Sequence, residues 1–308
     1  MRVTLRPGTH VLTRPDGDLQ VGLDPGSAMV LPGDDGVRET LARLSRPAGP
    51  APADDTTLSL LATHDLLLDE RALVAARAAG GAGAALARTH GAAADAVRAA
   101  RGATRVEVAT FGHACGADLG PRLTALLADA GLPACPDPPG LKRSRREGGS
   151  SGRRGRTTGG PPTGACAVLV GVGEPDRERV DDWTRAGTPH LAVRLTEGRA
   201  VLGPFVVPGH TACLRCLDGH HSDADPGWPL LVRQYAAASA ADRPDGVPEP
   251  VDPLLAAQAL AWAARDLAAF VDGARPSTWS ATVTLGPQPG DVETRCWLRH
   301  PACACTWD

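Results

Sequence analysis

The chain is poor in aromatic residues, in lysine and in long apolar runs. Aromatic side chains make up 3% of the 308 residues, so a core has to be built from Leu, Val and Ala. No uncharged apolar stretch of about 18 residues occurs, which argues against a membrane-spanning helix. The N-terminus, MRVTLRPGTH, lacks the apolar region of a secretory signal. We therefore expect a cytoplasmic protein with no membrane partner, whose eight cysteines are thiols or metal ligands rather than disulfides.

Residues 1–75 are expected to form a small module. Short apolar runs at Thr9–Arg14, Leu19–Leu23 and Ala28–Leu31 are separated by the turn sequences PDGD and DPGS. This pattern predicts a three-stranded antiparallel meander. The capped helical stretches GDDGVRETLARLS and DDTTLSLLATHDLLLDE follow it. Strands followed by short helices indicate a winged-helix-like module.

The charge of this module excludes a nucleic-acid partner. Residues 1–70 contain six arginines, no lysine and eleven acidic residues, a formal charge of −5, and the whole chain carries −3. A phosphate-binding surface requires the opposite sign. An extended peptide that adds to an exposed sheet edge fits the pattern. A dimerisation or packing module fits it equally well.

Residues 76–103 are rich in alanine and are expected to be a helical connector. Strands and helices alternate from Arg105 to Pro208, which predicts an α/β sheet in the region 104–308. Segment 141–164 is polar, basic and rich in Gly, and it holds Lys142, the chain's one lysine. We expect this segment to be a flexible loop.

The run Arg105–Gly112, followed by a glycine-bearing turn and a helix, looks like the opening of a nucleotide-binding βα unit. The turn is not G-x-G-x-x-G, because its glycines are spaced by four and His113 and Cys115 lie between them. Bulky side chains obstruct close approach of backbone amides to a phosphate, so a structural turn is favoured. The candidate nucleotide contacts are Gly112, Gly116, Gly120 and Asp137.

Two cysteine pairs far apart in sequence predict a structural metal site over residues 209–308. Cys213-x-x-Cys216 has a counterpart in Cys303-x-Cys305, and four thiolates form the usual closed zinc site. His300 or Cys296 could replace one ligand, and two unrelated thiol pairs are the other interpretation. Buried, inert thiols are expected at the remaining cysteines, Cys115, Cys135, Cys166 and Cys296.

The segments VVPGHTACLRCLD, HHSDADPGWPLLVRQY and HPACAC, with RPGTHVLTRPDGDLQVGLDPGSAMVL near the N-terminus, resemble a known family. It comprises the ThiF-like partner proteins of azoline-forming cyclodehydratases, which bind precursor leader peptides in thiazole/oxazole-modified microcin pathways. The resemblance implies a winged-helix-like peptide recognition element and a ThiF-like, Rossmann-type α/β domain. It also implies a zinc ion on Cys213, Cys216, Cys303 and Cys305.

The resemblance further implies a non-catalytic subunit that presents its precursor to a YcaO-domain enzyme. The leader would add as a strand along Ala28, Met29, Val30 and Leu31. ATP would be bound by the YcaO partner, and the family allows a homodimer. The turn FGHACGADLG departs from an open glycine loop, so we expect a degenerate ATP site. The alternatives are an active adenylyltransferase that acts on a peptide carboxylate, and a zinc-stapled interaction protein.

Overall fold

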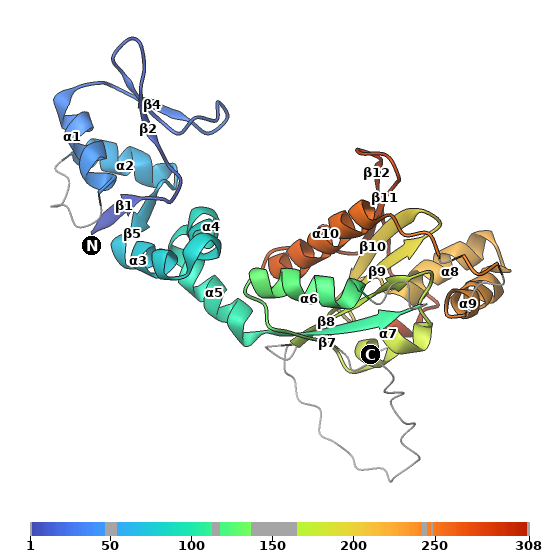
Figure 1. Ribbon diagram of the computed structural model, residues 1–308. Helices are drawn as coiled ribbons and strands as arrows, with labels where there is room; N and C mark the ends of the chain where they lie inside the picture. Colours follow the sequence, from blue (N-terminus) through green and yellow to red (C-terminus); the bar gives the residue numbers. More distant parts are fainter. Residues whose placement is uncertain are drawn as a thin grey trace, which may run out of the picture. The chain divides into compact units, whose positions relative to one another are not determined.

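The computed structural model describes residues 2–46, 54–112, 118–136, 165–241, 245–247 and 249–306. Gly116, Asp137 and the expected flexible segment 141–164 lie outside the described residues. The chain divides into two compact units, Met1–Ala99 and Ala100–Asp308, which are described separately (Figure 1).

The first unit contains the predicted antiparallel meander, which is confirmed. Its strands are β2 (Val11–Thr13), β3 (Leu19–Val21) and β4 (Met29–Leu31), in the order β2-β3-β4. Leu31 lies opposite Leu19, and both side chains are buried in the core of this unit. The order leaves β2 and β4 as the two edges of the small sheet. That the module is a winged helix stays a prediction.

Helices follow the meander, as predicted, but one leucine run was assigned wrongly. Asp34 caps α1 (Asp35–Leu44) and Asp54 caps α2 (Asp55–Thr63). The run after α2 is strand β5 (Leu67–Asp69), which pairs with the N-terminal strand β1 (Val3–Leu5). The apolar content of a leucine run does not distinguish helix from strand. Here the run forms a strand because it pairs with β1, more than sixty residues earlier in the sequence.

The alanine-rich stretch is helical and breaks at Gly80, which has a φ of +66°. Its helices are α3 (Glu70–Ala78), α4 (Gly80–His90), the single turn η1 (Gly91–Ala93) and α5 (Ala94–Ala103).

The second unit is built on a mixed seven-stranded sheet of order β12-β11-β10-β9-β8-β6-β7. Strands β7, β6, β8 and β9 run parallel, and the other three extend the sheet as antiparallel neighbours. This confirms the predicted α/β class. The bounds are β6 Arg105–Phe111, β7 Ala134–Pro136, β8 Ala165–Val172, β9 His190–Thr196, β10 Arg199–Val206, β11 Ala281–Leu285 and β12 Val292–Cys296.

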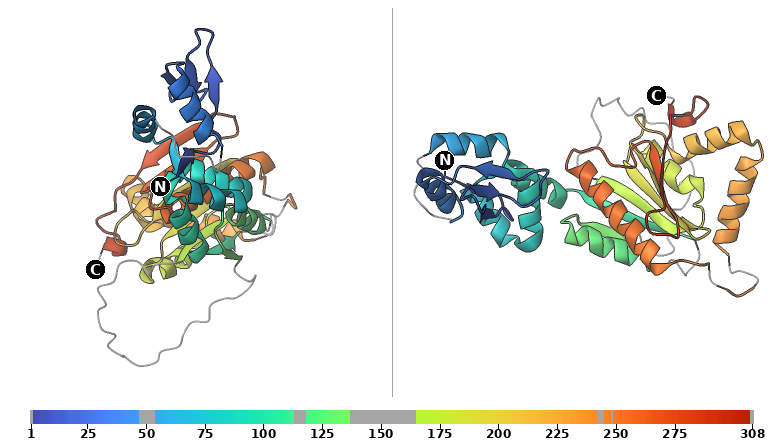
Figure 2. Two further views of the ribbon diagram at one scale, coloured as in Figure 1. Left: turned by 90° about the vertical axis from the view of Figure 1, so that its left-hand side faces the viewer. Right: turned by 90° about the horizontal axis from the view of Figure 1, so that it is seen from above.

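Helices cover both faces of this sheet (Figures 1 and 2). On one face α6 (Leu119–Asp129) and α10 (Pro253–Val271) pack against alternate residues of β8, such as Val168 and Val170. On the other face α7 (Arg177–Arg185) and α8 (Leu214–Ala224) pack against Leu169. Because β8 is buried on both faces, it reads as a continuous apolar run.

Helix α10 is long and apolar enough to cross a membrane by length and composition alone. It lies over the sheet with half of its apolar window buried, and its buried residues belong to the core of the second unit. Asp252 caps its N-terminus. Its buried Asp266 accepts hydrogen bonds from the backbone and hydroxyl groups of Ser277 and Thr278, so the carboxylate is satisfied inside the protein.

Candidate functional site

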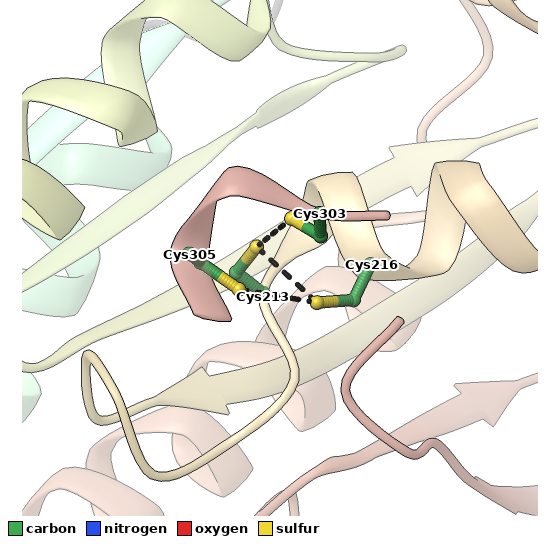
Figure 3. Close-up of side chains that lie close together, drawn as sticks. All are labelled: Cys213, Cys216, Cys303 and Cys305. Atoms are coloured by element: carbon green, nitrogen blue, oxygen red, sulfur yellow. Dashed lines mark hydrogen bonds between the residues drawn. The ribbon is translucent and has the colours of Figure 1, made fainter. Parts of the chain in front are cut away.

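The four predicted cysteine ligands lie together on the α7–α8 face of the sheet. Cys213 is the residue before α8, and Cys216 is in its first turn. Cys303 follows a turn, and Cys305 belongs to the short helix η3 (Ala304–Thr306). Figure 3 shows the four sulfur atoms turned toward one another, and all lie within 4.8 Å of each other. Cys213, Cys216 and Cys303 are buried, and Cys305 is half-buried.

The spacing of the sulfur atoms fits a metal and excludes a disulfide. Cys213 Sγ lies 3.7 Å from the Sγ atoms of both Cys216 and Cys303, and the Cys216–Cys305 distance is 3.3 Å. A disulfide bond is about 2.05 Å long. Four thiolates about 2.3 Å from a tetrahedral ion lie about 3.8 Å apart, close to this arrangement. The cluster can therefore hold a metal ion with little movement.

The thiols cannot all ionise without a cation. Hydrogen bonding with Cys216 and Cys303, together with burial, raises the pKa of the Cys213 thiol. Hydrogen bonding with Cys213 and Cys303 lowers the pKa of Cys216, the acceptor in this group. Burial and hydrogen bonding with Cys216 raise the pKa of Cys305 to about 12. A bound divalent cation reverses this balance, because it stabilises all four thiolates.

Neither alternative ligand joins the sulfur cluster. Cys296 is exposed on β12, and His300 turns its ring toward α8. Nε2 of His300 lies 3.1 Å from a carboxylate oxygen of Asp223, and the amide of Ala302 donates to its Nδ1. This pattern puts the ring proton on Nε2, so His300 hydrogen-bonds to Asp223 instead of presenting a lone pair. A Cβ on Gly219 would meet the His300 ring at 2.6 Å, so this glycine makes room for the tail.

A second group of potential ligands, His220, Asp223 and His300, lies beside the thiols. Nε2 of His220 donates to the carbonyl of Leu298, 2.9 Å away, and its ring packs edge-on against His300 at 4.9 Å. Hydrogen bonds already use these ring nitrogens. The group therefore fastens the C-terminal tail to α8 and supports the sulfur cluster.

The other cysteines are only partly as predicted. Cys166 is buried in β8, and burial raises the pKa of its thiol to about 12. Cys135 and Cys296 are exposed, which corrects the expectation of burial. Both lie on the two terminal strands of the large sheet, each of which pairs with a neighbouring strand on one side only. Cys115 lies outside the described residues.

The carboxyl ends of β6 and β8 are where an open α/β sheet binds its ligand, because the strand order reverses between them. Gly112, at the end of β6, has a φ of +83°, and a Cβ there would meet the Val172 carbonyl at 2.2 Å. Gly120 lies in α6 against Thr110 of β6, where a Cβ would come within 2.8 Å of the Thr110 methyl group. Both glycines therefore have packing roles.

Helix α9 (Trp228–Ser239) lies against the carboxyl ends of the neighbouring strands. A Cβ on Gly173, directly after β8, would meet the Ser239 hydroxyl at 2.0 Å. At the end of β9, the Thr196 hydroxyl lies 2.7 Å from that of Tyr235. Little space remains between this helix and the ends of β8 and β9.

A buried ion-pair network fills the same region, and sequence reasoning missed it. Arg177 forms two hydrogen bonds to Asp218, at 2.7 and 2.9 Å, and a third to Glu174 at 2.8 Å. Arg194 donates to the other oxygen of Glu174 at 2.8 Å. Burial acts to raise the pKa of Asp218, but the Arg177 hydrogen bonds outweigh it and leave this pKa below its usual value. The sequence feature that could have indicated this network is the charged run EPDRER, directly after a buried strand.

A groove of about 1010 Å³ lies beside this network and the sulfur cluster. Its walls come from the N-terminal end of α7, from α8 and α9, and from the tail around Cys303. Val232 and Ala236 of α9, with Ala240 directly after the helix, provide apolar surface, and Glu178 and Arg215 are among the charged residues of the groove. Arg215 is paired with Asp181.

The predicted peptide-binding residues lie on an edge of the small sheet in the first unit. Ala28 precedes β4, which holds Met29, Val30 and Leu31. Among the described residues, β4 pairs with β3 alone. Leu31 is buried, whereas the Val30 side chain is 49% exposed. The outer edge of β4 therefore offers main-chain groups and an exposed apolar side chain.

No family model matches the sequence, and no curated protein matches it. Solved structures with the same fold include the heterocyclase TruD, at 17% identity and a TM-score of 0.60, with 99% of this chain and 42% of that chain covered. They also include Escherichia coli MccB with ATP, at 13% identity and a TM-score of 0.61, with both chains fully covered. A third is the microcin C7 biosynthetic enzyme MccB with N-formylated MccA, at 14% identity and a TM-score of 0.60, with 99% and 100% covered.

This chain spans about two fifths of the TruD chain and the whole length of MccB. At these identities, the similarity shows a shared fold.

Proposed function

We propose that this protein binds the leader of a ribosomally made precursor peptide and presents it to a separate YcaO-type cyclodehydratase. The edge of β4 is the observation that carries the proposal. A leader segment added as a strand would gain main-chain hydrogen bonds along Ala28–Leu31, with Val30 contacting alternate leader side chains. The acidic charge of residues 1–70 favours a leader with basic residues.

Two similarities support this proposal. MccB has been solved with MccA bound, and its whole length has the fold of this chain. The TruD chain is a heterocyclase, and this chain corresponds to about two fifths of it. We infer that ring formation belongs to a second chain here, and that holding the leader raises the effective concentration of the precursor at that chain's active site.

The limited space and the paired charges at the carboxyl ends of the strands support a non-catalytic role. A triphosphate needs open backbone amides and space beside the strand ends. The end of β8 lies against Ser239, and the charges of Glu174, Arg177 and Asp218 are already paired with one another. ATP is therefore expected on the YcaO partner.

The four thiols would hold zinc in a structural role. Four sulfur ligands leave no open position for substrate, so the ion would only fasten the C-terminal tail to α8. We propose that the chain comprises a recognition element over 1–75, a connector over 76–103 and a ThiF-like domain over 104–308.

An adenylyltransferase is the second candidate, and one observation favours it. The strand–glycine–helix unit formed by β6, Gly112 and α6 is retained, and MccB, which shares the fold, has been solved with ATP. ATP–pyrophosphate exchange by the purified chain separates the two functions. No exchange above the background of a no-enzyme control is expected, and robust exchange would establish the adenylyltransferase.

Fluorescence polarisation tests peptide binding. The probes are labelled synthetic peptides that copy the N-terminal halves of small open reading frames beside this gene. Val30→Asp should weaken binding at least tenfold, because it places a charge in the strand-addition site. Leu12→Asp is the matched control, since Leu12 is 37% exposed on the opposite edge of the same sheet. Equal loss in both variants, or none in either, contradicts the β4 site.

A further inference from the structure

The hydrogen bonds of the β2–β3 hairpin fix which way each residue of the small sheet points its main-chain groups. The Arg14 amide donates to the Asp18 carbonyl at 2.8 Å, and the Gly22 amide donates to the His10 carbonyl at 2.8 Å. Residues that face each other in an antiparallel ladder alternate between a pair that exchanges both hydrogen bonds and a pair that exchanges none. The even-numbered residues of β3 therefore point their main-chain groups toward β2, and the odd-numbered residues point theirs toward β4.

This alternation continues into β4. Leu19 lies opposite Leu31 and Val21 lies opposite Met29, so Met29 and Leu31 exchange their hydrogen bonds with β3. Val30, between them, points both its N–H and its C=O away from β3. No strand of the described chain lies on that side of β4, so both groups of Val30 face the free edge.

The residue before β4 adds an acceptor to this edge and no donor. The C=O of one residue and the N–H of the next point in opposite directions, because the peptide group is planar and trans. Since Met29 points its N–H toward β3, the carbonyl of Ala28 points away from β3. The N–H of Ala28 already donates to the Asp24 carbonyl at 2.7 Å.

The residue after β4 also adds an acceptor alone. The Gly33 N–H donates at 3.2 Å to the carboxylate of Asp18, which directly precedes β3, so the carbonyl of Pro32 points outward. Proline has no N–H to donate. From Ala28 to Pro32 the edge therefore offers three acceptors and one donor, the N–H of Val30.

The two faces of the small sheet differ at this edge. Leu31 is buried, and the half-buried Met29 packs against the same core. Val30 points to the opposite face, in one row across the sheet with Gln20 and Leu12, and it is 49% exposed. Successive side chains of a strand point to opposite faces, so a strand added beside β4 would have alternate side chains on the core side and on the exposed side.

We propose that the leader is recognised through a five-residue segment that lies antiparallel to β4 and is read by its main chain at every second residue. This inference rests on the proposed leader-binding function. Antiparallel pairing continues the meander and is slightly more stable per residue than parallel pairing. The first, third and fifth leader residues donate their N–H groups to the carbonyls of Pro32, Val30 and Ala28. The third residue also accepts a hydrogen bond from the Val30 N–H.

The second and fourth leader residues contribute side chains instead of main-chain groups. They lie opposite Leu31 and Met29, and their side chains point to the core side, where apolar groups fit. Their N–H groups point away from β4, and a proline is compatible with a strand when its nitrogen faces solvent. The ligand is therefore a peptide with apolar residues at its second and fourth positions and no proline at its first, third and fifth.

An N-methyl scan tests this pattern. The probe is the labelled peptide, copied from a small open reading frame beside the gene, that binds the wild-type chain in fluorescence polarisation. Each residue of its binding segment is N-methylated in turn, which removes one donor and keeps the side chain. The dissociation constant should rise roughly tenfold at three alternate positions and less than about threefold at the two positions between them.

Serine substitution along the same segment is the matched control, because it changes the side chain and keeps the N–H. Its effects should have the opposite phase. The dissociation constant should rise roughly tenfold at the second and fourth positions, where an apolar contact is lost, and less than about threefold at the three positions that are sensitive to N-methylation.

The outcomes separate this inference from the proposed function. If no peptide binds, or if Val30→Asp binds the peptide as the wild type does, the leader-binding function and this inference are both wrong. If Val30→Asp weakens binding but N-methylation acts at adjacent positions or at none, this inference alone is wrong. Sensitivity to N-methylation and to serine at the same positions would indicate parallel addition, and it would also overturn the inference.

Discussion

Replacing Cys213 with serine removes one sulfur from the centre of the cluster and tests the proposed metal directly. Serine is a poor zinc ligand, so the metal should be released and the link through sulfur between the C-terminal tail and α8 lost. The side chain is buried, and the link from Cys213 to Cys303 joins residues 90 positions apart. Loss of the metal therefore removes a long-range clip as well as a ligand.

The size of the effect follows from loop closure. Treated as a cross-link, a clip that closes a loop of 90 residues constrains the unfolded chain by about 4.6 kcal/mol. For a unit of 150–250 residues, each 1 kcal/mol shifts the melting temperature by about 2–4 °C. A fall of roughly 9–18 °C is expected if the clip is lost completely.

The assay combines metal content by mass spectrometry with thermal melting. Wild-type protein should contain one zinc per chain, and Cys213→Ser should contain little. Cys135→Ser is the matched control, because Cys135 is exposed and lies outside the cluster. Chelation of the wild type should reproduce the low melting temperature, and added zinc should restore it. If Cys213→Ser keeps both its metal and its melting temperature, the ligand assignment is wrong.

Two further predictions concern the second unit. Gly173→Ala should destabilise the protein by about 1–3 kcal/mol in urea unfolding, because φ is +85° and the added Cβ meets Ser239. Adding Ser239→Gly should recover only the steric part, and an unchanged stability in Gly173→Ala would show that α9 does not lie against β8. Burial of His190 lowers its pKa from 6.5 to about 4, so the unfolded chain binds more protons between these values. Stability should therefore fall by about 2 kcal/mol between pH 7.5 and pH 5, and more toward pH 4. His190→Gln should lack this component, and an identical pH dependence in both proteins would contradict it.

Local sequence signals were sufficient for the regular elements. Turn residues separated β2, β3 and β4, and Asp252 with Pro253 marked the start of α10. The four cysteines could be grouped because Cys213-x-x-Cys216 and Cys303-x-Cys305 are the two closely spaced thiol pairs of the sequence. The sequence could not reveal that His300 faces Asp223, since that depends on the fold of the tail over Gly219.

Contacts between residues far apart in the sequence account for the remaining differences between the predicted and the observed structure. The leucines of β5 form a strand because β1 provides a partner at the other end of the unit. No helix was predicted directly after Cys213, although α8 and α9 form there. The charged run EPDRER does not by itself indicate a buried arginine, and Arg177 is buried because Asp218 reaches it from α8. Local spacing identifies neither β1 as the partner of β5 nor Asp218 as the partner of Arg177.

Reconstitution of precursor processing tests the central claim most directly. The precursor, the YcaO-type chain encoded nearby and ATP are combined with and without this protein, and ring formation is followed by mass spectrometry as loss of water. We predict rapid cyclisation only when this chain is present and the leader is intact, with Val30→Asp impaired and Leu12→Asp normal. Equal processing without this chain, or formation of AMP and pyrophosphate by this chain alone, would contradict the proposed presenting role.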